Sequence, residues 1–164
     1  MELKYYLKKY ESKKDFSEYW KIVTNEEVMK MNFGRIFTKE EASGLFDYMV
    51  KANETSGDFG YFRVYNSDND EYIGDAAIGK SDSDDQVEIE YMLMPEYWGK
   101  GLGKSIVDTL LGIIKTHKDI KKVIGIISPD NIRSRKILEG KGFTSVKVFT
   151  IDDGSEAEIL EKNI

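Results

Sequence analysis

The chain has no cysteine, only two prolines and a single histidine among its 164 residues. Without cysteine there is no disulfide framework, no cysteine ligand for a metal and no cysteine nucleophile. His117 lies between lysines near the expected end of a helix, which favours a surface position over a role as metal ligand or base. The sequence therefore predicts no metal site.

Long apolar runs are also missing, and the stretch from Met1 to Lys4 lacks the apolar core of a signal peptide. The formal net charge of −6 gives no basic surface for nucleic acid and suits a cationic amine better. We expect a cytoplasmic protein, monomer or homodimer, with no membrane or nucleic-acid partner. With 40% hydrophobic residues and no linker, residues 1–164 predict one domain with a real core.

The most informative stretch runs from residue 87 to residue 105. Apolar side chains alternate with Glu88, Glu90 and Met92 between Val87 and Leu93, which is the period of a strand. Pro95 cannot donate a ladder hydrogen bond and restricts the residue before it, so the strand ends near Met94.

Three glycines at alternate positions follow this strand: Gly99, Gly101 and Gly103. Glycine allows left-handed backbone angles and close approach of another molecule. Apolar residues then recur at helical spacing from Leu102 to Ile114, so the free N–H groups of the first helical turn face the glycines. Together with Lys100 and Lys104, they predict a site for a phosphate or pyrophosphate.

A plain tight turn is the alternative interpretation of the glycines, and two nucleotide motifs can be tested by spacing. The P-loop pattern fails because Trp98 stands where its first glycine belongs, although Gly103 to Ser105 supply its end. The dinucleotide fingerprint fails because the glycines are spaced Gly-x-Gly-x-Gly and the preceding strand alternates.

The stretch resembles the acyl-CoA pyrophosphate loop of the GNAT superfamily of N-acetyltransferases, whose motif is Arg or Gln, two residues, Gly, one residue, then Gly or Ala. Residues 98–103 match this motif except that Trp98 replaces Arg or Gln. A second segment, Asn131 to Ser134 running into Glu139 to Phe143, is similar to the family's second cofactor helix. Residues 97–99 are similar to the branch that contains the ribosomal-protein N-terminal acetyltransferases.

The resemblance implies one α/β (α+β) domain, with a mixed, mostly antiparallel twisted sheet of six to seven strands and about four helices on both faces. It implies acetyl-CoA as co-substrate and no metal. The residues that it implies for binding acetyl-CoA are Met92, Leu93, Met94, Gly99, Lys100, Gly101, Leu102, Gly103, Lys104, Ser105, Asn131 and Ser134.

Periodicity and turn residues predict the other elements. Strands are expected at Glu2–Leu7, Phe59–Tyr65, Glu71–Ile78, Lys122–Ile127, Thr144–Ile151 and Ala157–Glu161, the last two as a hairpin. Helices are expected from Lys13 or Asp15 to Asn25, from the capping box Thr38–Glu41 through Val50, and from Asn131 to Gly142. We expect Lys122–Ile127 to be covered on both faces and parallel to Val87–Met94, and Gly74 to mark a bulge.

The implied reaction is direct attack of a primary amine on acetyl-CoA, whose pantetheine arm lies between the strands at 87–94 and 123–127. Glu88 and Glu90 are the candidate bases, with solvated surface charges as the alternative. The tyrosine that many relatives use as thiolate proton donor corresponds to Leu138, so Ser134 is the substitute, although its hydroxyl could instead bond only backbone.

Phe33, Arg35 and Phe37 are candidates for the acceptor wall, although each aromatic could simply be core. The predicted function is acetyl-CoA-dependent transfer to the primary amine of a protein N-terminus or a small molecule. A non-catalytic acyl-CoA-binding module and a nucleotide-binding hydrolase are the alternatives.

Overall fold

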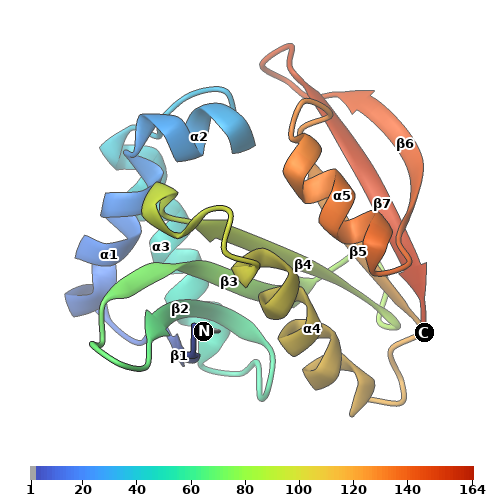
Figure 1. Cartoon of the computed structure of the whole chain (residues 1–164), viewed down its shortest axis with the longest axis horizontal. Coiled ribbons are helices and arrows are strands. Elements are labelled where there is room, and N and C mark those ends of the chain that lie inside the picture. Colours follow the sequence, from blue (N-terminus) through green and yellow to red (C-terminus); the bar gives the residue numbers. More distant parts are fainter. Residues whose placement is uncertain (1–2) are drawn as a thin grey trace.

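Seven strands form a single sheet in residues 3–164, the part of the chain that the computed structural model describes (Figure 1). Their order is β1-β2-β3-β4-β5-β7-β6, and every neighbouring pair is antiparallel except β4 and β5. The strands are β1 (Tyr5–Lys9), β2 (Gly60–Asn66), β3 (Tyr72–Lys80), β4 (Gln86–Leu93), β5 (Lys122–Ile127), β6 (Thr144–Thr150) and β7 (Glu156–Asn163). The predicted mixed sheet is confirmed, including the parallel pair and the terminal hairpin. Glu2, where the first strand was expected to begin, lies outside the described residues.

Five α-helices cover the sheet in residues 3–164, one more than predicted. They are α1 (Phe16–Val23), α2 (Glu26–Asn32), α3 (Lys39–Asn53), α4 (Leu102–Lys115) and α5 (Ile132–Gly140). Helices α1 to α3 pack on one face and α4 and α5 on the other (Figure 1). No helix in the described part of the chain is both long and apolar enough to cross a membrane.

The additional helix is α2, which lies between the predicted helix ending at Asn25 and the predicted helix beginning at Thr38. Helix α1 ends at Val23, and the Asn25 side chain then accepts a hydrogen bond from the Val28 N–H at 3.1 Å. This N-cap starts α2 in a new direction. Lys30 to Asn32, expected to lie in a connection, therefore form the last turn of α2, whereas the predicted capping box of Thr38 and Glu41 is present at α3.

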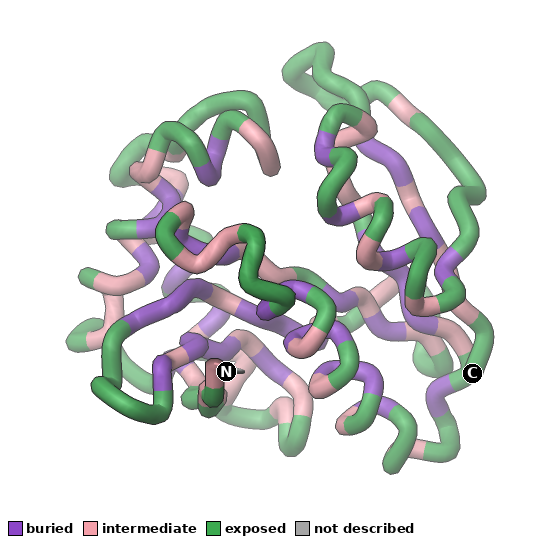
Figure 2. The backbone as a smooth tube through the Cα atoms, viewed as in Figure 1, coloured by how far each residue is buried: buried purple, intermediate pink, exposed green. Residues whose placement is uncertain are grey.

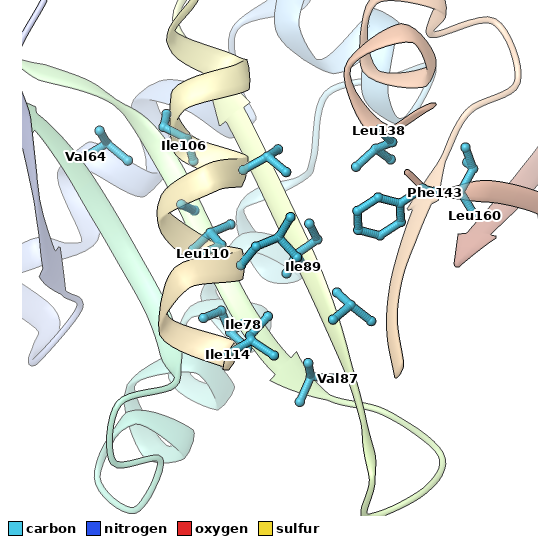
Figure 3. Close-up of a cluster of buried hydrophobic side chains, with 14 of the residues drawn as sticks. Val64, Ile78, Val87, Ile89, Ile106, Leu110, Ile114, Leu138, Phe143 and Leu160 are labelled. Atoms are coloured by element: carbon cyan, nitrogen blue, oxygen red, sulfur yellow. The ribbon is translucent and has the colours of Figure 1, made fainter. Parts of the chain in front are cut away.

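The alternation along β4 separates two hydrophobic cores. Val87, Ile89 and Leu93 join the core under α4. Figure 3 shows Val87 and Ile89 of this core together with Ile106, Leu110 and Ile114. Met94 joins the second core, which is built largely from α1 to α3. Figure 2 shows that the buried positions concentrate on the central strands and on the inner sides of the helices. The two side-chain faces of β4 thus point to different environments.

Strands β4 and β5 part before their C-terminal ends. Their paired residues run only from Gln86 opposite Lys122 to Ile89 opposite Gly125. Beyond that point β4 continues to Leu93 and β5 to Ile127 without pairing to each other. Ile126 is therefore 41% exposed, which corrects the expectation that β5 is covered on both faces throughout.

Gly74 in β3 lets β4 approach closely. The pairing of β2 with β3 shifts by one residue beside Gly74, so the predicted bulge is confirmed. A Cβ at this position would lie 2.1 Å from the main-chain oxygen of Met92. Only glycine fits there, and its small size fixes the position of β4.

Candidate active site

A cavity of about 950 Å³ opens where β4 and β5 separate. Its walls come from α1 to α3, from strands β2 to β5, from α5 and from the β6–β7 hairpin. Asn131 at the start of α5 donates to Asn32 at the end of α2 across 3.3 Å, so side chains from opposite sides of the cavity meet. The parting of the strands has thus produced a space large enough for a small-molecule ligand.

Glu88 and Glu90 both line this cavity, on the face of β4 opposite to Val87 and Ile89. Glu88 is half-buried and Glu90 is exposed. Burial, followed by a hydrogen bond and charge repulsion from Glu90, raises the pKa of Glu88 to about 9. A carboxyl with a raised pKa holds its proton at neutral pH. Once it has lost that proton, it accepts one from a substrate more readily than an ordinary carboxylate does.

Asp75 is a third carboxylate of the cavity and was not among the predicted site residues. The hydroxyls of Tyr10 and Tyr72 both donate to its Oδ1 atom, at 2.5 Å and 2.7 Å. Burial raises the pKa of Asp75 to about 7, although the two tyrosine hydrogen bonds act in the opposite direction. An aspartate among apolar residues of a central strand was the available signal, because such positions rarely carry an acid without a purpose.

The three residues predicted for the acceptor wall all line the cavity. Phe33 and Phe37 lie with their ring centres 5.1 Å apart. Arg35 binds Glu41 through two hydrogen bonds, of 2.8 Å and 2.6 Å. The charge of Arg35 is therefore already balanced by Glu41, which leaves the two rings as the open part of this wall.

The glycine loop lies between the short 3-10 helix at Pro95–Tyr97 and α4. Gly99 and Gly101 adopt left-handed φ angles of 75° and 79°, and a Cβ on either would meet nothing within 4 Å. Gly103 differs from the prediction, because it is helical and a Cβ there would lie 2.8 Å from Ile137 Cδ1. Its role is therefore to let α4 and α5 pack closely.

The main-chain N–H groups from Gly101 to Lys104 donate to no protein group within residues 3–164. They lie at the positive end of the α4 dipole, and the side chains of Lys100 and Lys104 beside them are exposed. The loop can therefore hold an anion, as its sequence predicts.

Trp98, which departs from the family motif, has two contacts. Its indole N–H donates to the Leu93 carbonyl at 2.8 Å. The guanidinium of Arg133 on α5 lies 5.0 Å from the centre of its ring. Arg133 thus places a positive charge beside Trp98, the residue that replaces the arginine or glutamine of the family motif. Arg133 was not among the predicted site residues.

The predicted residues of α5 have distinct surroundings. Asn131 caps the helix by accepting from the Ser134 N–H at 3.2 Å. The Tyr91 hydroxyl donates to the Ser134 hydroxyl at 3.3 Å, so Ser134 does more than bond backbone. Leu138 is buried, in contact distance of Gly125. Ser134 is the predicted substitute for the family's tyrosine, whose position Leu138 occupies. The Tyr91 side chain on β4 therefore contacts this substitute proton donor.

Along β4, the main-chain N–H groups that are available to a ligand lie on alternate residues. The Met94 N–H donates to the Ile73 carbonyl of β3 at 2.8 Å, so it is not available to a ligand, contrary to expectation. Because successive strand residues direct their N–H groups to opposite sides, Met92 also faces β3, while Tyr91 and Leu93 face the gap toward β5. Leu93 is thus the predicted residue whose N–H points into the gap.

Comparisons with known proteins agree with this geometry. Residues 5–144 match the family described as acetyltransferase (GNAT) domain. The chain therefore belongs to the GNAT acetyltransferase family, which its glycine loop and the segment at 131–143 resemble. The FsC-acetyl coenzyme A-N(2)-transacetylase of Aspergillus fumigatus is 27% identical over 138 residues, which are 79% of this chain and 58% of that relative. The chain therefore spans less than two thirds of the length of this curated relative.

Solved structures share the fold at low sequence identity. A GNAT-family acetyltransferase from Bacillus anthracis has a TM-score of 0.78 at 18% identity, covering 99% of this chain and 98% of that one. Spermidine N-acetyltransferase from Vibrio cholerae, in complex with CoA and spermine, has 0.76 at 15%, covering 97% and 95%. RimL, a ribosomal L7/L12 alpha-N-protein acetyltransferase in complex with CoA, has 0.78 at 14%, covering 98% and 94%. Identities this low show the fold alone, so the ribosomal branch stays a prediction.

Proposed function

We propose that this protein transfers the acetyl group of acetyl-CoA to a primary amine held in the cavity, in the cytoplasm. The observation that carries the proposal is the parting of β4 from β5 directly beside the free N–H groups of the glycine loop. A strand edge and an anion site side by side suit a ligand with an extended amide-bearing arm and a diphosphate.

The residues of the chain fit coenzyme A at both ends of the gap. The N–H groups from Gly101 to Lys104, with Lys100 and Arg133, would bind the diphosphate. The edge of β4 at Tyr91 and Leu93 would hydrogen-bond the arm. Two of the structural relatives carry CoA, which supports acetyl-CoA as co-substrate.

Groups on β4 and α5 would then serve the reaction. The Tyr91 N–H, which adjoins Glu90 and faces the gap, stabilises negative charge developing on the thioester oxygen while the amine attacks the carbonyl carbon. Glu88, with Glu90 beside it, takes the proton that the amine must lose. Ser134 donates its proton to the sulfur as the carbon–sulfur bond breaks, and Tyr91 replaces that proton through their hydrogen bond.

Acetyl transfer, a non-catalytic acyl-CoA-binding module and a nucleotide-binding hydrolase can be distinguished by measuring which ligands stabilise the protein. Thermal unfolding with acetyl-CoA, CoA, ATP and NAD should show stabilisation by the first two only, because ligands stabilise the state that binds them. Release of CoA in the presence of primary amines should then establish turnover. Equal stabilisation by ATP would favour a nucleotide-binding hydrolase, and binding of acetyl-CoA without turnover of any amine would favour a non-catalytic module.

A further inference from the structure

The cavity carries more negative than positive charge. Its acidic side chains are Asp75, Glu88, Glu90, Asp130, Asp153 and Glu156, and its basic ones are Lys30 and Arg35. Arg35 is already paired with Glu41 at 2.6 Å, so its charge does not balance the acids of the cavity. A space lined in this way attracts cations and repels anions.

Asp75 has an oxygen atom left over for a ligand. Both tyrosine hydroxyls bond to Oδ1, while Oδ2 accepts no hydrogen bond from any residue between 3 and 164. The side chain is half-buried and forms part of the cavity wall. The two tyrosines thus hold the carboxylate in place without using its second oxygen.

Asp75 lies at a fixed distance from the candidate bases. In the pairing of β3 with β4, Ala77 is opposite Glu90 and Asp75 is opposite Met92. Asp75 and Glu90 are therefore diagonal neighbours on one face of the sheet, with main chains about 7–8 Å apart. Glu90 lies between Asp75 and Glu88, so the two ends of the row could each hold one charge of an extended molecule.

Aromatic rings surround this row of carboxylates. Tyr10, Tyr19 and Tyr61 line the same cavity, and ring faces attract cations. Among the described residues no cluster of His, Asp and Glu is arranged to hold a metal ion. Rings combined with well-separated carboxylates suit an organic cation of some length.

Resting on the proposed function, we propose that Asp75 is a specificity-determining residue that binds the second positive charge of the acceptor. The acceptor is then an alkane diamine or a longer polyamine. Its reacting amine lies at Glu88 and Glu90, and its distal ammonium lies between the Oδ2 atom of Asp75 and the tyrosine rings. An acceptor with a single amine would leave Asp75 unused.

The unmodified protein provides the first test. 1,4-Diaminobutane and pentan-1-amine have nearly the same length but differ in the second amine, so their kcat/KM values from CoA release isolate its contribution. We expect the diamine to be preferred by about tenfold or more, mainly through KM, as for a charge-assisted hydrogen bond. Equal values for the two amines would overturn the proposal, and this measurement does not depend on any variant folding.

The second test is Asp75→Asn, which keeps the shape of the side chain and an oxygen for Tyr10 and Tyr72. We expect KM for the diamine to rise about tenfold while KM for pentan-1-amine stays unchanged. Asp153→Asn is the matched control, because Asp153 lies in an exposed turn of the cavity rim, bonded to Ser155. This variant should keep the preference for the diamine.

Two outcomes separate this inference from the proposed function. If Asp75→Asn lowers kcat/KM equally for both amines, Asp75 has only a structural role and the inference fails, although acetyl transfer stands. If acetyl-CoA does not raise the unfolding temperature of the unmodified protein, the proposed function itself fails and the inference fails with it.

Discussion

Glu88 and Glu90 are adjacent on one face of β4, so the charge of Glu90 affects the ionisation of Glu88. An acid buried beside another acid stays protonated to higher pH than an isolated one. The raised pKa therefore favours the neutral form of Glu88 at neutral pH, and a cationic amine entering the cavity would favour the charged form. Binding of the amine would thus favour the deprotonated form of Glu88 that acts as the base.

Glu88→Gln should lower kcat by about a hundredfold or more, because the base is removed while the shape is kept. Glu88 works as a base only when deprotonated, so activity due to it rises with pH through its raised pKa. The ratio of wild-type to variant rates, measured from pH 6 to pH 10, cancels the ionisation of the amine and should rise with pH. A ratio that does not change with pH would remove Glu88 from the mechanism.

Arg133→Gln should raise KM for acetyl-CoA about tenfold and leave kcat unchanged, because a cation beside the glycine loop is lost. No carboxylate in the described part of the chain pairs with Arg133, so the change should not disturb the fold. Lys115→Gln at the other end of α4, about 20 Å away, is the control. If both variants raise KM equally, the loss of any positive charge weakens binding, and a direct contact of Arg133 with acetyl-CoA is contradicted.

At the scale of elements, the position of β4 depends on its neighbour β3. Gly74→Ala should lower the free energy of unfolding by about 3 kcal/mol, because its Cβ would collide with the Met92 carbonyl at 2.1 Å and the backbone must move. Gly112→Ala is the matched control, since a Cβ there meets nothing within 4 Å in the middle of α4. It should stabilise by roughly 0.5–1 kcal/mol. Urea unfolding measures both, and a Gly74→Ala protein as stable as wild type would contradict the close approach.

The elements that could be predicted are those with a clear local sequence pattern. Alternation identified β4, Pro95 and the glycines identified its end, and Thr38 with Glu41 identified the start of α3. Helix α2 was missed because it has only seven residues, too few for a clear apolar period. Its signal was Asn25 followed by two glutamates, which is an N-cap with acids in the first turn.

The site was predictable only in part, for a different reason. Motif positions gave the glycine loop, Asn131 and Ser134 directly. Asp75, Tyr91 and Arg133 act through contacts between elements that are distant in sequence: the pairing of β3 with β4, the hydrogen bond from Tyr91 to Ser134, and the contact of Arg133 with Trp98. Such relations involve contacts between elements, which no local pattern contains.

For the molecule as a whole, two raised carboxyl pKa values tie stability to pH. Asp75 and Glu88 have folded pKa values of about 7 and about 9, above their unfolded values of roughly 4. A raised value means that the stabilisation is complete below the unfolded pKa and is lost as pH rises through the folded pKa. The unfolding temperature should therefore fall between pH 5 and pH 9, and the fall should be smaller in Glu88→Gln. An equal fall in both proteins would show that Glu88 does not contribute.

The four residue pairs that join β4 to β5 are a narrow seam between two halves of the sheet. Beyond them, the Tyr91 and Leu93 amides have no strand beside them, so in the ligand-free protein their hydrogens should exchange with deuterated solvent quickly. An extended arm lying in the gap would act as a surrogate strand and slow that exchange. Coenzyme recognition would then complete the molecule's own secondary structure, and the bound protein would be mechanically stiffer across the seam than the free one.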